Sequence, residues 1–284
     1  MDLGTFLDTS KVILKNTFYQ LAFSIGVIAL FGFIVGLLNN AFYKLVGDKI
    51  GRIVCLLTGF IGVPIHEIGH AFFCLIFGHK IDAMKLYQPN NAEGTLGYVM
   101  HSYNKRNIFH QFGNFFIAFG PILFGSAVLF VLMFWLVPNL FGAFRNNLGL
   151  SQILTFSNFS ASAHLYFFDI LRRTVITFYS FSDLRDWRWW LFIIPACSIA
   201  LNMSLSVPDI KTSWTGFSFI VIALLIANTS LYFLDIDKSI ALVNYCLTAG
   251  AVITNFLMIS IVFSLFLLLL GVIVRVLMGL RGKT

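Results

Sequence analysis

Charged residues are scarce in this sequence, at 11% of its 284 residues, whereas hydrophobic residues make up 58%. In a soluble domain about a quarter of the residues are charged. A chain with so few charges cannot cover a globular surface with polar groups, so we expect lipid to solvate much of it. The scarcity excludes an ordinary soluble domain and favours a membrane protein.

Closely spaced cysteines are also missing, because the four cysteines lie far apart and inside apolar runs, at Cys55, Cys74, Cys197 and Cys246. Without a CxxC pair, the sequence favours neither a disulfide framework nor a zinc ribbon. We expect these cysteines to be small apolar packing residues. No basic stretch with interleaved aromatic residues is present, so the formal charge of +7 is expected at phospholipid headgroups and not on nucleic acid.

Long apolar runs dominate the sequence, and six of them are long enough to cross a membrane, since a spanning helix needs about 20 mostly apolar residues. The runs cover residues 18–39, 53–77, 110–137, 188–206, 214–234 and 244–278. They predict an all-α polytopic membrane protein with about six transmembrane helices. We expect a single membrane-embedded domain over residues 1–284, located in the plasma membrane, with a core at 53–234 and accessory spans at 18–39 and 244–278.

The longest polar stretch, residues 78–106, directly follows the second apolar run. Within it, Ile81–Tyr87 and Thr95–Tyr103 have strand-like patterns, and the turn-rich sequence QPNNAEG lies between them. We therefore predict a small β-hairpin on the membrane face. A second connecting stretch, at 139–187, ends in SDLRDWRWW, which is typical of an aromatic belt at a membrane interface.

The second apolar run contains the sequence GVPIHEIGHAFF, in which His66 and His70 are four residues apart. On a helix these side chains share one face, and two imidazoles at this spacing can bind one zinc ion. Glu67 can reach a zinc-bound water as general base and then pass the proton to a leaving amine. This is the HExxH pattern of zinc peptidases. Gly69 and Ala71 keep the helix surface thin, which lets a substrate or a neighbouring helix come close.

The surroundings of this motif narrow its interpretation, because the whole sequence has only two glutamates, Glu67 and Glu93, and six histidines. A charge inside a membrane span costs about 2.5–3.5 kcal/mol on insertion scales. Three ionisable residues together in one span need an explanation, and a bound metal supplies one. The alternative is a buried polar cluster that only packs helices together.

A catalytic zinc site needs a third protein ligand and an open position for water. We predict Asp209 as this ligand, because it lies in the segment LNMSLSVPDI, where Pro208 interrupts a regular helix. Asn202 could hydrogen-bond a substrate backbone or a developing oxyanion, and Ser204 and Ser206 could line a polar cleft beside it. The alternative role for Asp209 is a cap at a helix end.

Other side chains are candidates for the third ligand. Asp169 is the second choice, although neighbouring arginines favour an ordinary ion pair there. His101 and His110 are expected at the membrane interface, His79 is expected at the mouth of the motif helix, and no motif surrounds His164.

Together these motifs resemble the site-2 protease family of intramembrane zinc metalloproteases. The resemblance rests on HEIGH inside a span, a Gly-led hairpin after it, the sequence FGPILFG and a later Asn/Pro/Asp segment. It covers roughly residues 53–234. Ile210, and not the glycine of the family pattern, follows the aspartate. The sequence contains no PDZ or CBS domain to filter substrates.

The resemblance implies that His66, His70 and Asp209 bind zinc and that Glu67 is the catalytic base. It implies hydrolysis of peptide bonds in transmembrane or membrane-associated protein substrates. Such a substrate must be extended, and the exposed edge of the hairpin could pair with it. One alternative is a catalytically inactive member that acts as a partner-binding or regulatory module. Another is a small transporter with a proton relay, but the sequence shows no second-half counterpart of the motif helix.

Overall fold

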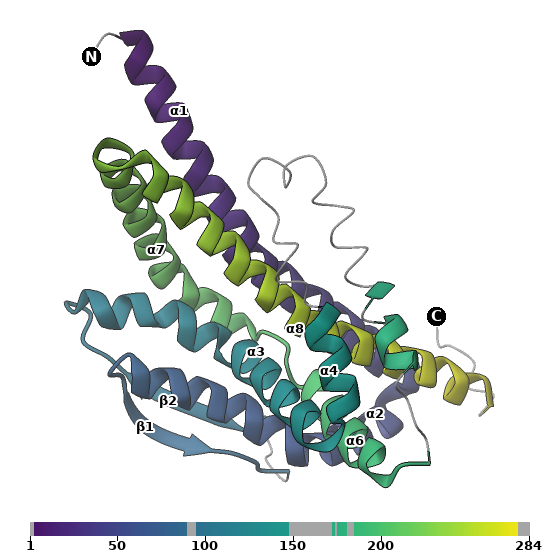
Figure 1. The fold of residues 1–284 in the computed structure, drawn as a ribbon. Helices are drawn as coiled ribbons and strands as arrows, with labels where there is room; N and C mark the ends of the chain where they lie inside the picture. The colour runs from purple at the N-terminus through teal and green to yellow at the C-terminus, as the bar shows by residue number, and fades with distance from the viewer. Residues whose placement is uncertain (1–2, 90–94, 148–171, 174, 181–184, 278–284) are drawn as a thin grey trace.

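The computed structural model describes residues 3–89, 95–147, 172–173, 175–180 and 185–277 (Figure 1). These residues are mostly helical, and they include one small two-stranded antiparallel sheet, as the sequence predicted. The helices are α1 (Leu3–Gln20), η1 (a π-helix, Leu21–Gly26), α2 (Val27–Ile76), α3 (Ile108–Leu136), α4 (Pro138–Asn147), α6 (Trp187–Leu201), α7 (Val207–Leu234) and α8 (Ile236–Leu277).

Within the described residues, four helical stretches are long and apolar enough to cross a membrane. They are Phe6–Ile76, Ile108–Leu136, Pro208–Leu234 and Leu257–Leu277. Large apolar side chains such as Leu57 and Trp135 are exposed on these helices, and lipid can cover them without a desolvation cost. The helices therefore indicate that the chain associates with a membrane, while the number of spans stays a prediction.

The first of these stretches, Phe6–Ile76, is 71 residues long and contains nearly all of two predicted runs. A straight helix of that length would measure about 107 Å, far more than the hydrocarbon thickness of about 30 Å. The helix is interrupted at Gly47, where φ is 76° and ψ is 169°, a region that essentially only glycine occupies. The chain turns there, and the HExxH motif lies on the segment after the turn.

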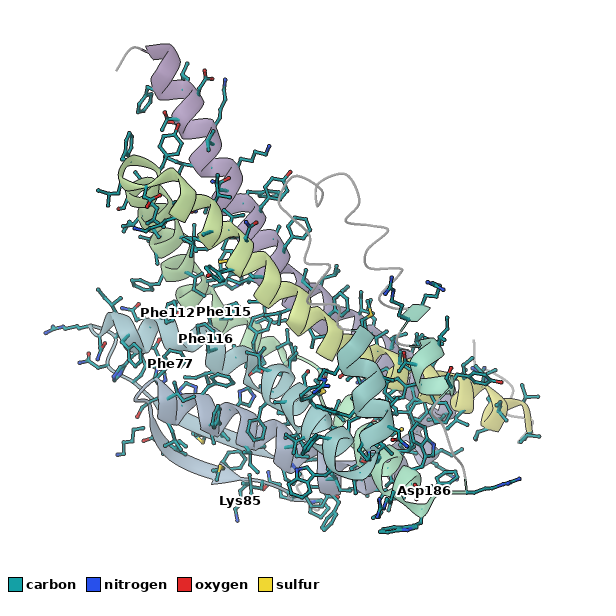
Figure 2. The ribbon with its side chains drawn as sticks, viewed as in Figure 1. Phe77, Lys85, Phe112, Phe115, Phe116 and Asp186 are labelled. Carbon is teal, nitrogen blue, oxygen red and sulfur yellow. The ribbon has the colours of Figure 1, made fainter. Side chains whose placement is uncertain are left out.

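The predicted run at 188–206 is only partly helical. Its helix, α6, has 15 residues and ends at Leu201, so it measures about 22 Å. Asp186, labelled in Figure 2, begins it, because its carboxylate accepts a hydrogen bond of 2.9 Å from the backbone N–H of Arg188. The chain is then non-helical until α7 begins, with Pro208 in its first turn, where a missing N–H costs no helical hydrogen bond.

The predicted hairpin follows α2 directly, and Gly78, with a φ of 70°, turns the chain into it. Its strands β1 (Lys80–Lys85) and β2 (Tyr98–Ser102) pair antiparallel, with one irregularity in the register. Both strands are shorter than predicted. Most of the predicted turn, residues 90–94, lies outside the described residues.

Two contacts hold α2 against α3. A Cβ atom added to Gly69 would lie 2.8 Å from the carbonyl carbon and oxygen of Gly120, so the two backbones touch where these glycines cross. Further along, aromatic rings gather between the helices (Figure 2), and the ring centroids of Phe77 and Phe116 are 5.1 Å apart. The expectation that Gly69 lets a neighbouring helix come close is confirmed, and the crossing brings α3 beside the histidines of α2.

Candidate metal centre

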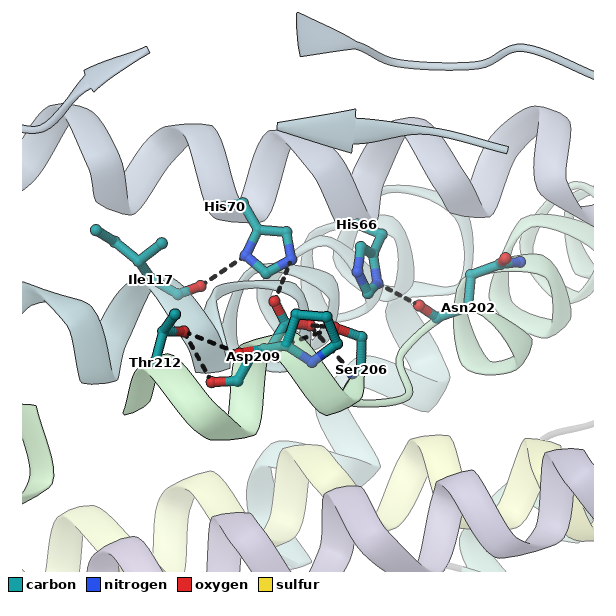
Figure 3. A network of polar contacts seen from close by, with 8 residues as sticks. His66, His70, Ile117, Asn202, Ser206, Asp209 and Thr212 are labelled. Atoms are coloured by element: carbon teal, nitrogen blue, oxygen red, sulfur yellow. Dashed lines mark hydrogen bonds and ion pairs between the residues drawn. The ribbon is translucent and has the colours of Figure 1, made fainter. Parts of the chain in front are cut away.

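Two helices bring three potential metal ligands together (Figure 3). His66 and His70 project from α2 and Asp209 from the first turn of α7, and their ligand atoms all lie within 4.8 Å of one another. Nε2 of His70 is 3.6 Å from Oδ1 of Asp209. Neighbouring ligand atoms in a tetrahedral zinc site are about 3.3 Å apart, given bonds of about 2.0–2.2 Å. The spacing therefore approaches the spacing that a zinc ion needs.

Each imidazole of the centre is hydrogen-bonded to a backbone carbonyl oxygen. Nδ1 of His66 is 2.6 Å from the carbonyl oxygen of Asn202, and Nδ1 of His70 is 2.7 Å from the carbonyl oxygen of Ile117. A carbonyl can only accept, so each Nδ1 carries the hydrogen and donates it. Each Nε2 is left with its lone pair, which is the form that binds a metal. Metal-binding histidines are usually oriented in this way.

Asp209 has two roles in the structure, one for each carboxylate oxygen. Oδ2 accepts hydrogen bonds from the backbone N–H and the hydroxyl of Ser206, at 3.0 and 2.5 Å. Ser206 in turn accepts the backbone N–H of Asp209, which completes a capping box at the start of α7. Oδ1 faces His70. The two alternatives for Asp209, a cap and a ligand, are therefore compatible.

A buried polar network fixes the end of α6, directly before the non-helical segment. Nδ2 of Asn39, from α2, donates to the carbonyl oxygens of Ala200 and Leu201, each at 3.0 Å. The hydroxyl of Ser264, from α8, donates to Oδ1 of Asn39 at 3.1 Å. Two helices, α2 and α8, thus hold the end of α6 just before Asn202, whose carbonyl oxygen accepts a hydrogen bond from His66. Sequence analysis missed this network, because no motif marks Asn39 or Ser264.

The three ligand side chains open onto a cavity of about 560 Å³. Glu67 also lines this cavity and is buried, with 7% of its surface exposed. Gly97 lies directly against it, since a Cβ atom added there would be 2.9 Å from Cγ of Glu67. The hairpin therefore forms one wall of the cavity and shields Glu67.

The donor atoms of this centre are two imidazole nitrogens and one carboxylate oxygen, a set found in catalytic zinc sites with three protein ligands. Comparisons with protein-family models, curated proteins and solved structures found no match. The residues present fit a zinc ion on their own chemistry. His66, His70 and Asp209 would hold it, and the cavity leaves room beside them for water and substrate.

Asn202, predicted to bind substrate, lines the cavity together with Ser204 and Ser206, so the expected polar side of the cleft is present. Its Nδ2 donates to the carbonyl oxygen of Ser198 at 2.8 Å. The observed role of Asn202 is to support a histidine through its backbone carbonyl. A contact between its side chain and substrate stays a prediction.

Among the described residues, no other histidine joins this centre as a ligand. His101 lines the cavity, and His79 is buried, with 4% of its surface exposed, just beyond the end of α2. These two residues and Cys74 form a second group whose ligand atoms all lie within 4.8 Å of one another. Sequence analysis missed this group. The candidates outside the described residues are His164 and Asp169.

Proposed function

We propose that this chain is a membrane-embedded, zinc-dependent metalloendopeptidase that hydrolyses peptide bonds of membrane-associated protein substrates. The observation that carries the proposal is the convergence of His66, His70 and Asp209 from two helices, beside the buried carboxylate of Glu67. The same residues carry the resemblance to the site-2 protease family, and membership of that family is part of the proposal. So is a multi-pass arrangement in the plasma membrane, with about six spans.

Peptide hydrolysis requires an activated water, a proton acceptor and a donor for the leaving amine. A bound zinc ion supplies Lewis acidity and lowers the pKa of water. Glu67 takes a proton from water in the cavity and delivers it to the leaving amine. His66 and His70 would hold the metal through their Nε2 lone pairs, and Asp209 would hold it through its carboxylate.

The hairpin offers a way to present an extended substrate. Tyr98 and Val99 of β2 line the cavity, and among the described residues β2 pairs only with β1. A substrate strand can add to the free edge of β2 through backbone hydrogen bonds. This pairing favours an unwound substrate, because the carbonyls of a helix are already hydrogen-bonded within it.

The test uses the full-length protein in detergent with a synthetic transmembrane peptide, and mass spectrometry detects the cut. Glu67→Gln should keep zinc and slow cleavage by about 10²–10⁴-fold, the usual contribution of a general base. His66→Ala should lose both zinc and cleavage. Glu93→Gln changes the only other glutamate of the chain and should keep both. Cleavage by Glu67→Gln at the wild-type rate would show that the proposal is wrong.

A further inference from the structure

A second group of potential metal ligands lies where α2 meets the hairpin. Cys74 is close to the end of α2, His79 follows the turn at Gly78, and His101 is on β2. Their ligand atoms all lie within 4.8 Å of one another. The group consists of one sulfur and two imidazole nitrogens, and it shares no ligand with the centre described above.

The hydrogen bonds of His79 fix which of its nitrogens is free. Nε2 is 2.8 Å from the carbonyl oxygen of His110. A carbonyl only accepts, so Nε2 carries the hydrogen and Nδ1 keeps its lone pair. Nδ1 of His79 is 3.1 Å from Nδ1 of His101, which must therefore donate to it. A metal ion that replaced this hydrogen would be bound by both nitrogens.

The surroundings keep both rings in place and neutral. The ring of Tyr103 stacks on His79, with centroids 4.8 Å apart and an angle of 18° between the planes. Burial lowers the pKa of His79, and burial followed by the proximity of His79 lowers the pKa of His101. Neutral imidazole is the form that binds a metal.

Cys74 is the third member of the group. Its side chain is fully buried, with 0% of its surface exposed, and its carbonyl oxygen accepts the backbone N–H of His79 at 2.8 Å. This hydrogen bond folds the chain back, so that His79 returns over the end of α2. Sulfur and imidazole donors together suit zinc, whereas magnesium and calcium prefer oxygen ligands.

We propose that Cys74, His79 and His101 form a second, non-catalytic Zn²⁺ site that fastens the hairpin to α2. Binding releases the thiol proton of Cys74, and the hydrogen of the neutral His101 ring shifts from Nδ1 to Nε2 by exchange with water, so that a thiolate and two imidazole lone pairs face the ion. The site holds β2, which also forms a wall of the cavity, in a fixed position relative to α2. This inference stands whether or not the first centre is catalytic.

The test uses Co²⁺ as a spectroscopic probe on the full-length protein in detergent. A thiolate bound to Co²⁺ gives a charge-transfer absorption band in the near ultraviolet, which a centre of two histidines and an aspartate cannot give. We expect wild-type protein to bind two ions and to show the band. The double variant His66→Ala/His70→Ala should bind one ion and keep the band.

Cys74→Ser should bind one ion and lose the band, whereas Cys197→Ser, which changes another buried cysteine, should keep two ions and the band. Co²⁺ retained at the first centre shows that Cys74→Ser is folded. If that variant does not fold, His101→Gln answers the same question through loss of one ion and of the band. A wild-type protein without the band, or a band that survives in both Cys74→Ser and His101→Gln, would overturn the proposal.

Discussion

Two ligand clusters use the same helix, α2, but their surroundings differ. The first ends in a carboxylate, opens onto a cavity and has the buried carboxylate of Glu67 beside it. The second cluster contains the buried thiol of Cys74, and Tyr103 stacks on the ring of His79. In both, a backbone carbonyl holds the Nδ1 or Nε2 hydrogen of an imidazole. The comparison teaches that a hydrogen bond from an imidazole to a backbone carbonyl can orient the histidines of both sites. The access of water and substrate to the ligands, and the neighbouring carboxylates, then decide what each site can do.

Asp209→Asn should separate the two clusters most strongly. A neutral amide is a poor zinc ligand, so we expect the zinc affinity of the first centre to fall by more than about 100-fold, beyond the effect of a typical outer-shell change. The second cluster should keep its metal. Competition with a chromophoric chelator measures the affinity, and the thiolate–cobalt band reports on the second cluster.

Ser206→Ala is the control for this change, because it removes the cap and keeps the carboxylate. It should cost about 1 kcal/mol of stability and lower zinc affinity by about 10-fold, because it removes one hydrogen bond to the carboxylate; this loss is well short of that expected for Asp209→Asn. Unchanged zinc affinity in Asp209→Asn would show that Asp209 is not a ligand. Loss of metal from both clusters would show that they are not independent.

Asn39→Leu should weaken the first centre from a distance. It removes the hydrogen bonds that fix the segment before Asn202, so the carbonyl behind His66 is held less firmly. We expect zinc affinity to fall by about 10-fold, the lower end of outer-shell effects, with the second cluster unchanged. Asn40→Leu changes the exposed neighbour and should leave zinc affinity as it is. Equal losses in the two variants would contradict the role given to Asn39.

Gly97→Val tests the wall of the cavity and not its ligands. The added side chain would meet Val63 and Glu67, and overpacking of this kind costs about 1–3 kcal/mol. We expect peptide cleavage to slow by about tenfold, which corresponds to about 1.4 kcal/mol, while zinc content stays the same. Gly142→Val is matched to it, because an added Cβ atom there has nothing within 4 Å. A Gly97→Val protein that cleaves at the wild-type rate would show that the hairpin need not lie so close to Glu67.

Tyr103→Leu should have the smallest effect, confined to the second cluster. Stacking between rings contributes about 0.5–1.5 kcal/mol, so the Co²⁺ affinity of that cluster should fall by at most about tenfold, while zinc binding at the first centre should not change. Tyr245→Leu, at a tyrosine with 74% of its surface exposed, is the control. A weaker first centre in Tyr103→Leu would mean that the clusters are coupled through β2.

Sequence analysis found the residues of the first centre that lie within one local segment. His66, Glu67 and His70 follow the period of a helix, and Asp209 is marked by the proline before it. The carbonyl partners of the two histidines could not be predicted, because every residue has a carbonyl oxygen. Only tertiary packing selects the carbonyl of Asn202 for His66 and the carbonyl of Ile117 for His70.

The second cluster was beyond sequence analysis for a different reason. Cys74 and His79 lie on opposite sides of a helix end, where helical periodicity stops. His101 joins them only through the register of the hairpin, which places it opposite Ile81. Helix ends had a similar limit, since residues 18–39 and 53–77 were predicted as two separate spans, whereas the chain stays helical between them apart from the break at Gly47.

The position of Asp209 in the first turn of α7 has a consequence for electrical charge. Backbone N–H groups at a helix start favour a negative side chain, and Asp209 occupies such a position. Asp209 and Glu67, both in the carboxylate form, would balance the charge of one divalent cation. A centre that held such a cation would then be electrically neutral, which lowers the cost of burying it. A bound cation would therefore offset the cost of placing two acidic side chains together in a mostly apolar helix bundle.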